Sequence, residues 1–201
     1  MPWPISTRPW PGAGPMSEGY SVIYADPPWD YRGQTQHSGK GSTGTGGAAS
    51  HYQTITLQRL KTLRVADHCA PDALLFLWAT GPHLDQAIDL LKSWGFRWAT
   101  VAFVWAKDRV NPGFYTMSQC EFVLCGKRGR IPQPRGARNV RQLVEAPRGR
   151  HSRKPAEVRR RIVEMFPDHR RLELFARERA EGWDAWGHEV VSDVEMYWGT
   201  G

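Results

Sequence analysis

Residues 20–31, YSVIYADPPWDY, join an apolar run to a rigid polar turn. The first six residues have the length and composition of a buried strand. The two prolines end that strand, because proline lacks the backbone N–H that a sheet requires. An aspartate, two rigid residues and a tryptophan therefore follow the strand directly. The stretch predicts a strand that places Asp26 and Trp29 at one edge of a sheet.

Strand and helix patterns alternate through the rest of the chain. Helical patterns occur at 56–70, 82–96 and 154–166, and strand patterns at 72–80, 100–107, 120–127, 171–177 and 183–190. This alternation predicts an α/β fold, with a mostly parallel sheet and helices on both of its faces. Ligands bind such sheets at the carboxyl ends of the strands. Residues 20–25 would deliver DPPW to that edge, and a parallel strand at 171–177 would deliver Arg177.

The length of 201 residues predicts one domain. We expect this domain at residues 19–190, between a flexible Pro/Gly-rich tail at 1–18 and a C-terminal tail at 191–201. Residues 33–50 are small and polar, which predicts a mobile loop. Their glycines approximate a phosphate loop and a dinucleotide motif, but the required spacing or flanking strand is missing. The loop is therefore not expected to bind a nucleotide, although it could close over a substrate.

Basic residues are concentrated in one part of the chain. The formal net charge is +7, and residues 127–161 contain 13 of the 27 lysines and arginines. Such a segment suits a polyanionic partner, most simply nucleic acid. A solvated basic face without a specific ligand is the alternative, and charge alone leaves both interpretations open.

The composition also bears on compartment, membrane and metal. No apolar run approaches the ~20 residues that span a bilayer, and the first residues lack the apolar segment of a signal peptide. We therefore expect no membrane partner and a cytoplasmic location. Cys69, Cys120 and Cys125 form neither an even disulfide framework nor a zinc-binding array. A reduced compartment, no metal and cysteines that pack rather than react are expected.

The DPPW motif suits a planar amine such as adenine, whose exocyclic nitrogen is a weak nucleophile. An ionised Asp26 only accepts hydrogen bonds, and the Pro27 carbonyl accepts them without a competing N–H from the same residue. Two such acceptors would hold both amino hydrogens in a turn that Pro28 keeps rigid. Trp29 would stack on the base, and Tyr31 would add a second aromatic wall. A purely structural turn with a packed tryptophan is the alternative interpretation.

ADPPW resembles the catalytic motif of the adenine-N6 methyltransferases related to the catalytic subunit of the eukaryotic messenger-RNA adenine methyltransferase. This family also has bacterial and phage members. APDALLFLWAT, HSRKPAEV and RRLELFARERAEGWDAWGHEV match it in the same order, so the resemblance spans residues 20–190. It implies a Rossmann-like class I fold and S-adenosylmethionine (SAM) as the methyl donor. It also implies a permuted order, in which the catalytic motif precedes the cofactor motifs.

The resemblance assigns roles to single residues. The catalytic residues would be Asp26, Pro27, Pro28 and Trp29. The substrate-binding residues would be Tyr31, Lys107 and Glu121. The cofactor-binding residues would be Ala25, Asp26, His151, Ser152, Lys154, Phe175, Arg177, His188 and Glu189. Lys154 would pair with the methionine carboxylate and Glu189 with the ribose hydroxyls. Relatives usually carry Asn where this chain has His188, whose charge depends on pH.

These residues predict direct transfer of a methyl group from SAM to adenine N6, with no covalent enzyme intermediate. The target base must be flipped out or single-stranded to enter such a pocket. Either the basic segment or a second subunit, in a homodimer or with another chain, would position the nucleic acid. We expect DNA, with RNA as the alternative substrate. An inactive nucleic-acid-binding scaffold is the alternative of another class, and the presence of Asp26, Trp29 and Lys154 argues against it.

Overall fold

The computed structural model describes residues 19–30, 54–112, 115–149 and 153–199. Seven strands of these residues form one sheet: β1 (Tyr20–Ala25), β2 (Cys69–Thr80), β3 (Arg97–Asn111), β4 (Ser118–Arg128), β5 (Leu143–Ala146), β6 (Arg171–Leu174) and β7 (Asp184–Trp186). The helices are α1 (Leu57–Lys61), α2 (Leu84–Ser93) and α3 (Ala156–Met165), with short 3-10 turns η2 (Val65–His68) and η3 (Gly81–His83). The predicted tail at 1–18 and loop at 33–50 lie outside the described residues.

The sheet is mostly parallel, as predicted. Its order is β5-β3-β4-β2-β1-β6-β7, and β4 alone among the described strands runs against its neighbours. The strands on either side pair in parallel, β1 with both β2 and β6, β6 with β7, and β3 with β5. β1 is thus an inner strand, and its carboxyl end lies beside those of β2 and β6.

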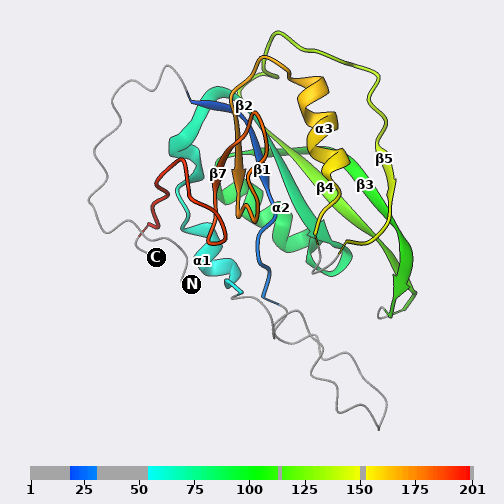
Figure 1. The fold of residues 1–201 in the computed structure, drawn as a ribbon. Helices are drawn as coiled ribbons and strands as arrows, with labels where there is room; N and C mark the ends of the chain where they lie inside the picture. Colours follow the sequence, from blue (N-terminus) through cyan, green and yellow to red (C-terminus); the bar gives the residue numbers. More distant parts are fainter. Residues whose placement is uncertain (1–18, 31–53, 113–114, 150–152, 200–201) are drawn as a thin grey trace.

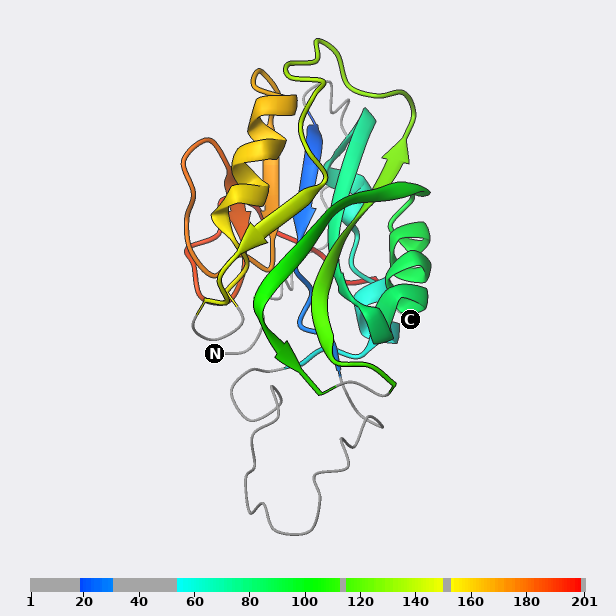
Figure 2. The ribbon, with the colours of Figure 1, turned by 90° about the vertical axis from the view of Figure 1, so that its right-hand side faces the viewer.

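Helices cover both faces of the sheet, because successive side chains of a strand point to opposite faces. Leu75 and Leu77 of β2 belong to a core cluster shared with α1 and α2, which includes Leu90. Phe76 of the same strand faces α3, where it packs in a second cluster with Ile162. Figures 1 and 2 show α3 on one side of the sheet and α2 on the other. The prediction of an α/β sheet with helices on both faces is therefore confirmed.

Three local features differ from the sequence-based expectations. β5 was not predicted as a strand, and the helical pattern at 56–70 forms only α1 followed by η2. The predicted C-terminal tail packs on the domain as far as residue 199. Met196 is buried in the core, and Trp198 forms an isolated β-bridge with Leu63. Within the described ranges, every helix falls short of the length and apolarity needed to cross a membrane.

Candidate active site

The DPPW motif forms a tight turn at the carboxyl end of β1. The Trp29 N–H donates to the Pro27 carbonyl at 2.9 Å, and the Ile55 N–H donates to the Pro28 carbonyl at 3.0 Å. The Pro27 oxygen thus uses one of the two lone pairs that a carbonyl carries, and the second can still accept a hydrogen bond. Asp26 directly precedes this turn, and Ala25 before it is fully buried in β1. The turn is therefore held at two points while Asp26 stays at the edge of the sheet.

The indole of Trp29 lies in the protein core. Its side chain is 5% exposed, and its Nε1 donates to the Trp78 carbonyl at 3.3 Å. One face stacks on His83, with ring centroids 5.7 Å apart, and His83 in turn hydrogen-bonds the Thr80 hydroxyl at 2.9 Å. In the structure, Trp29 therefore anchors the turn to the end of β2. Tyr31, predicted to add the second aromatic wall, lies outside the described residues.

Four charged side chains of alternating sign run along the carboxyl edge of the sheet, and we call them the charge chain: Asp26, Lys154, Glu121 and Lys107. Lys154 Nζ lies 3.0 Å from Asp26 Oδ2 and 3.4 Å from Glu121 Oε2. Lys107 Nζ donates to Glu121 Oε1 at 3.0 Å. The register brings these residues together, because Glu121 of β4 lies opposite Thr80 of β2. Antiparallel β4 begins at the same edge where β1, β2 and β3 end, so it contributes its first residues to the site.

Burial and mutual attraction oppose each other within the charge chain. The side chains of Lys107 and Glu121 are 6% and 13% exposed, and Asp26 is half-buried. Burial raises the pKa of Asp26 above the ordinary aspartate value, and the Lys154 ammonium offsets this only partly. Burial acts on Glu121 in the same direction, but the ammonium groups of Lys154 and Lys107 outweigh it and lower the pKa of Glu121. Glu121 is thus held firmly as a carboxylate, whereas Asp26 gives up its proton less readily.

Aromatic rings that the sequence analysis did not single out line the charge chain. The ammonium of Lys154 lies 5.4 Å from the ring centroid of Trp78, and that of Lys107 lies 5.6 Å from Trp105. Trp78 Nε1 donates to the hydroxyl of Tyr24 at 2.6 Å, which fixes the orientation of the indole. Cation–π contacts of this kind stabilise a desolvated ammonium. Tyr24, Trp78 and Trp105 pack in one cluster on the same face of the sheet, and the alternation of side chains along their strands is the signal that would have found them.

A second group of predicted residues follows β6. Phe175 comes directly after this strand with a φ of 62°, in the left-handed region that non-glycine residues rarely adopt. Its ring is held by Trp94, which stacks on it with ring centroids 6.3 Å apart, and by Trp186 in a T-shaped contact with ring centroids 5.3 Å apart. The segments after β6 and β7 also approach closely, since a Cβ on Gly187 would lie 2.1 Å from the Ala176 carbonyl oxygen. Tight packing therefore maintains the strained backbone of Phe175.

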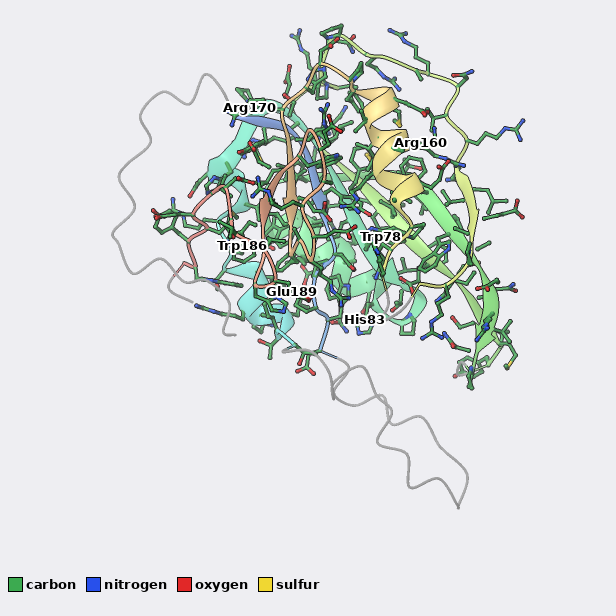
Figure 3. All side chains as sticks on the ribbon, in the orientation of Figure 1. Trp78, His83, Arg160, Arg170, Trp186 and Glu189 are labelled. Atoms are coloured by element: carbon green, nitrogen blue, oxygen red, sulfur yellow. The ribbon has the colours of Figure 1, made fainter. Side chains whose placement is uncertain are left out.

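Arg177 and Glu189, which follow β6 and β7, form an ion pair with Arg177 Nε 3.0 Å from Glu189 Oε1. His188 Nε2 lies 3.6 Å from the same oxygen. Burial lowers the pKa of His188, although Glu189 opposes the shift, and the net effect favours the neutral imidazole. Arg177 also lowers the pKa of Asp26, but its effect is smaller than those of burial, which raises this pKa, and of Lys154, which lowers it. Arg177 thus links this group electrostatically to the charge chain. Figure 3 shows Glu189 and His83 on the lower side of the view and Arg170 at the opposite edge.

The structure thus brings most of the predicted site residues to one edge of the sheet. The charge chain unites two predicted substrate residues, Lys107 and Glu121, with Asp26 and Lys154. Phe175, Arg177, His188 and Glu189 form the second group. His151 and Ser152 lie outside the described residues, so their predicted cofactor contacts stay predictions.

The three cysteines are free thiols. Burial raises the pKa of Cys69 to about 12 and that of Cys125 to about 11. Both therefore remain protonated near neutral pH and lack the thiolate that a nucleophilic cysteine requires.

The basic segment predicted to bind nucleic acid divides into two parts. The arginines of α3 pair with glutamates: Arg159 Nη1 lies 3.0 Å from Glu173 Oε2, and Arg161 Nε lies 2.7 Å from Glu157 Oε1. Arg160 bonds the same Glu157 at 2.6 Å. These charges are largely neutralised within the protein. In contrast, the exposed Arg138, Arg141 and Arg148 form no ion pair among the described residues.

The mostly parallel sheet, with DPPW at the end of an inner strand, defines a Rossmann-like methyltransferase fold. The chain belongs to the MT-A70 family, whose model matches residues 20–189. It is 49% identical over 181 residues to the type II methyltransferase M.MunI of a Mycoplasma species, covering 85% of this chain and 78% of the relative. The Arabidopsis thaliana N(6)-adenosine-methyltransferase MT-A70-like protein is 28% identical, over 85% of this chain and 24% of that protein.

A fungal relative extends the comparison to a protein named for RNA. The N6-methyladenosine RNA methyltransferase MTA1 of Cryphonectria parasitica is 29% identical over 194 residues, 89% of this chain and 54% of that protein. Together, the family and these relatives confirm the predicted resemblance, the fold class and the prediction of an adenine-N6 methyltransferase. A methyltransferase of this family implies SAM as the methyl donor.

Proposed function

We propose that this protein transfers a methyl group from SAM to the N6 amino group of adenine in DNA. The observation that carries the proposal is the position of Asp26. This carboxylate lies at the carboxyl end of β1, 3.0 Å from the Lys154 ammonium. It is next to the Pro27 carbonyl, whose second lone pair can still accept a hydrogen bond. A carboxylate and a carbonyl beside one another provide the two acceptors that an adenine amino group needs.

The chain's own groups act on the amino nitrogen before and during transfer. Asp26 and the Pro27 carbonyl accept its two hydrogens, which turns the nitrogen lone pair away from the ring and makes it more nucleophilic. The turn is already formed, through the hydrogen bonds of Trp29 and Ile55, so little reorganisation is needed. As the nitrogen becomes positively charged, the nearby Asp26 carboxylate stabilises that charge and is the nearest acceptor for the departing proton.

The donor set at the edge of the sheet fits SAM. SAM, when bound, supplies a methyl group on a sulfonium, and the neutral thioether that remains after transfer is a good leaving group. Lys154 offers an ammonium to the methionine carboxylate, and Glu189 offers a carboxylate to the ribose hydroxyls. Ala25, Phe175, Arg177 and His188, with His151 and Ser152, complete the proposed cofactor contacts.

DNA is favoured over RNA by the pattern of similarity. The Mycoplasma relative, named as a type II methyltransferase, is 49% identical and is covered over 78% of its length. The relatives named for adenosine or RNA are 28% and 29% identical and are covered over 24% and 54% of their length. The higher identity to the type II methyltransferase therefore supports DNA as the substrate.

Mass spectrometry tests the proposal directly. The protein is incubated with SAM carrying a deuterated methyl group, together with unmethylated bacterial DNA or with RNA, and the nucleosides are then analysed. Labelled N6-methyladenine is expected in DNA, and Asp26→Asn is expected to abolish it while the protein stays folded. Label in RNA alone would establish the RNA alternative. Absence of label together with absence of SAM binding would establish the inactive scaffold.

A further inference from the structure

β3 and β4 continue beyond the sheet as a two-stranded ribbon, which we call the β3–β4 ribbon (residues 108–111 and 118–120). β2 ends opposite Glu121, and β5 ends opposite Lys107. Past these positions only β3 and β4 pair with each other, through Asn111 and Ser118. Figure 2 shows the two strands extending at the lower side of the sheet. The ribbon therefore projects from the edge that carries the charge chain.

The ribbon is bent rather than straight. The pairing of β3 with β4 shifts register at three places, and the last shift lies in the ribbon. There the pair Ala106–Cys120 is followed by the pair Asn111–Ser118, so β3 has several extra residues. Such bulges bend and re-aim a strand, and they are frequent next to active sites. Glu121 lies three residue steps from Ser118 along β4, which corresponds to roughly 10 Å at about 3.4 Å per step.

Apolar side chains stand in solvent on this ribbon and its tip. Tyr115 is 99% exposed, Met117 59% and Val110 47%. Isolated exposed apolar residues are ordinary, but three at one projecting tip mark an interaction site. Aromatic and aliphatic side chains of this kind are those that proteins insert between base steps.

Among the charges on and beside the ribbon, the basic Arg109 and Arg148 outnumber the acidic Asp108. Arg109 is exposed on the ribbon. Arg148 is bonded to the ribbon, because its backbone N–H donates to Asp108 Oδ1 at 2.8 Å and its Nη1 donates to Asn111 Oδ1 at 2.9 Å. A basic surface around an apolar tip complements phosphates, and a second copy of a chain with net charge +7 would be repelled.

A two-stranded ribbon has the dimensions for a DNA groove. The major groove is about 12 Å wide and about 8.5 Å deep and admits such a ribbon, and the ribbon extends roughly 10 Å past Glu121. A base in a duplex must leave the stack before it can reach Asp26. The ribbon thus lies where the duplex would be when an adenine occupies the site.

We propose that the β3–β4 ribbon enters a groove of the target duplex and that Tyr115 fills the space from which the adenine is extruded. This inference rests on the proposed function. Arg109 and Arg148 hold the flanking phosphates, and Tyr115 keeps the neighbouring base pairs from closing on the gap. The duplex then remains open while the adenine amino group is at Asp26.

Comparison of duplex and single-stranded substrates tests this role. Tyr115→Ala is expected to slow methylation of unmethylated duplex DNA by about tenfold or more, because unstacking is costly only in a duplex. The same DNA denatured by heat should be methylated within about twofold of the wild-type rate. Tyr115→Phe should behave as wild type on both substrates. Trp98→Ala, which removes a 49% exposed aromatic at the other end of β3, is the matched control and should change neither rate. An equal loss on both substrates, or no loss, would overturn the proposal.

Cross-linking tests the contact without requiring methylation. A photoreactive p-benzoylphenylalanine at position 115 should cross-link the full chain to labelled duplex DNA under ultraviolet light, and the same group at position 98 should not. Cross-links between two protein chains at position 115 would show self-association instead and would refute the ribbon as a DNA element. Cross-linking to DNA at position 115 without any methyl transfer would uphold the ribbon while rejecting the proposed function.

Discussion

Glu121→Gln should destabilise the protein strongly, because Glu121 neutralises two ammonium groups at once. Its oxygens lie 3.0 Å from Lys107 Nζ and 3.4 Å from Lys154 Nζ. At an effective dielectric constant of ~20, each pair supplies roughly 5 kcal/mol of Coulomb attraction, which the cost of desolvation largely offsets. The substitution removes the attraction but leaves the 6% exposed Lys107 in place. Loss of one partner of a buried pair typically costs about 3–5 kcal/mol, and we expect a loss of this size in the free energy of unfolding.

Urea unfolding followed by tryptophan fluorescence measures this loss, since the chain contains 10 tryptophans. Adding Lys107→Met to Glu121→Gln should restore much of the stability, because Lys154 retains Asp26 and no buried ammonium then lacks a carboxylate. Glu145→Gln, at an exposed position of β5, is the control and should change stability by less than about 0.5 kcal/mol. A loss below about 1 kcal/mol for Glu121→Gln would refute the electrostatic account of the site.

Three further predictions concern the site and its support. Since burial raises the pKa of Asp26 and the ionised form is required, the rate of methyl transfer should fall with decreasing pH at a higher pH than for an ordinary aspartate; a pH–rate profile without this acidic limb would contradict the role. Lys154→Met should weaken SAM binding in calorimetry by about tenfold or more, whereas Lys92→Met on the exposed side of α2 should leave it unchanged. Gly187→Ala should cost about 1–3 kcal/mol in thermal unfolding, because its Cβ would meet the Ala176 carbonyl at 2.1 Å. Gly81→Ala, with open space around it, should be tolerated, and equal effects at both glycines would count against this reasoning.

The sequence predicted the inner strands and α2 well, because their hydrophobic periods are long and unbroken. β5 escaped detection because it has four residues, of which only Val144 is buried, in a segment dominated by arginine. The helical spacing of Leu57, Leu60 and Leu63 extended past the true end of α1, where Leu63 instead pairs with Trp198. Local periodicity records which side chains are buried, but it does not record which distant segment buries them.

The candidate site was predictable in its members but not in its contacts. Family motifs indicated Asp26, Lys154 and Glu121. The sequence did not predict, however, that Lys154 lies between the carboxylates of the other two residues. That contact depends on the register of β4 against β2, which hydrophobic alternation does not determine. Trp29 was expected at a base pocket, and its indole proved to be buried against His83. A large aromatic beside a candidate catalytic aspartate can serve packing, and composition alone does not separate the two roles.

The four residues of the charge chain come from both halves of the polypeptide. Asp26 and Lys107 precede the connection between β3 and β4, whereas Glu121 and Lys154 follow it. The pairs Asp26–Lys154 and Lys107–Glu121 therefore each join the first half of the chain to the second. Two fragments separated at that connection would each contain one acid and one base of the chain. Only Lys154 would keep a carboxylate of its own fragment nearby, Glu121 at 3.4 Å, whereas Asp26 and Lys107 would each lose their partner. The protein is thus a natural candidate for a split reporter, in which methylation of DNA records the meeting of two halves.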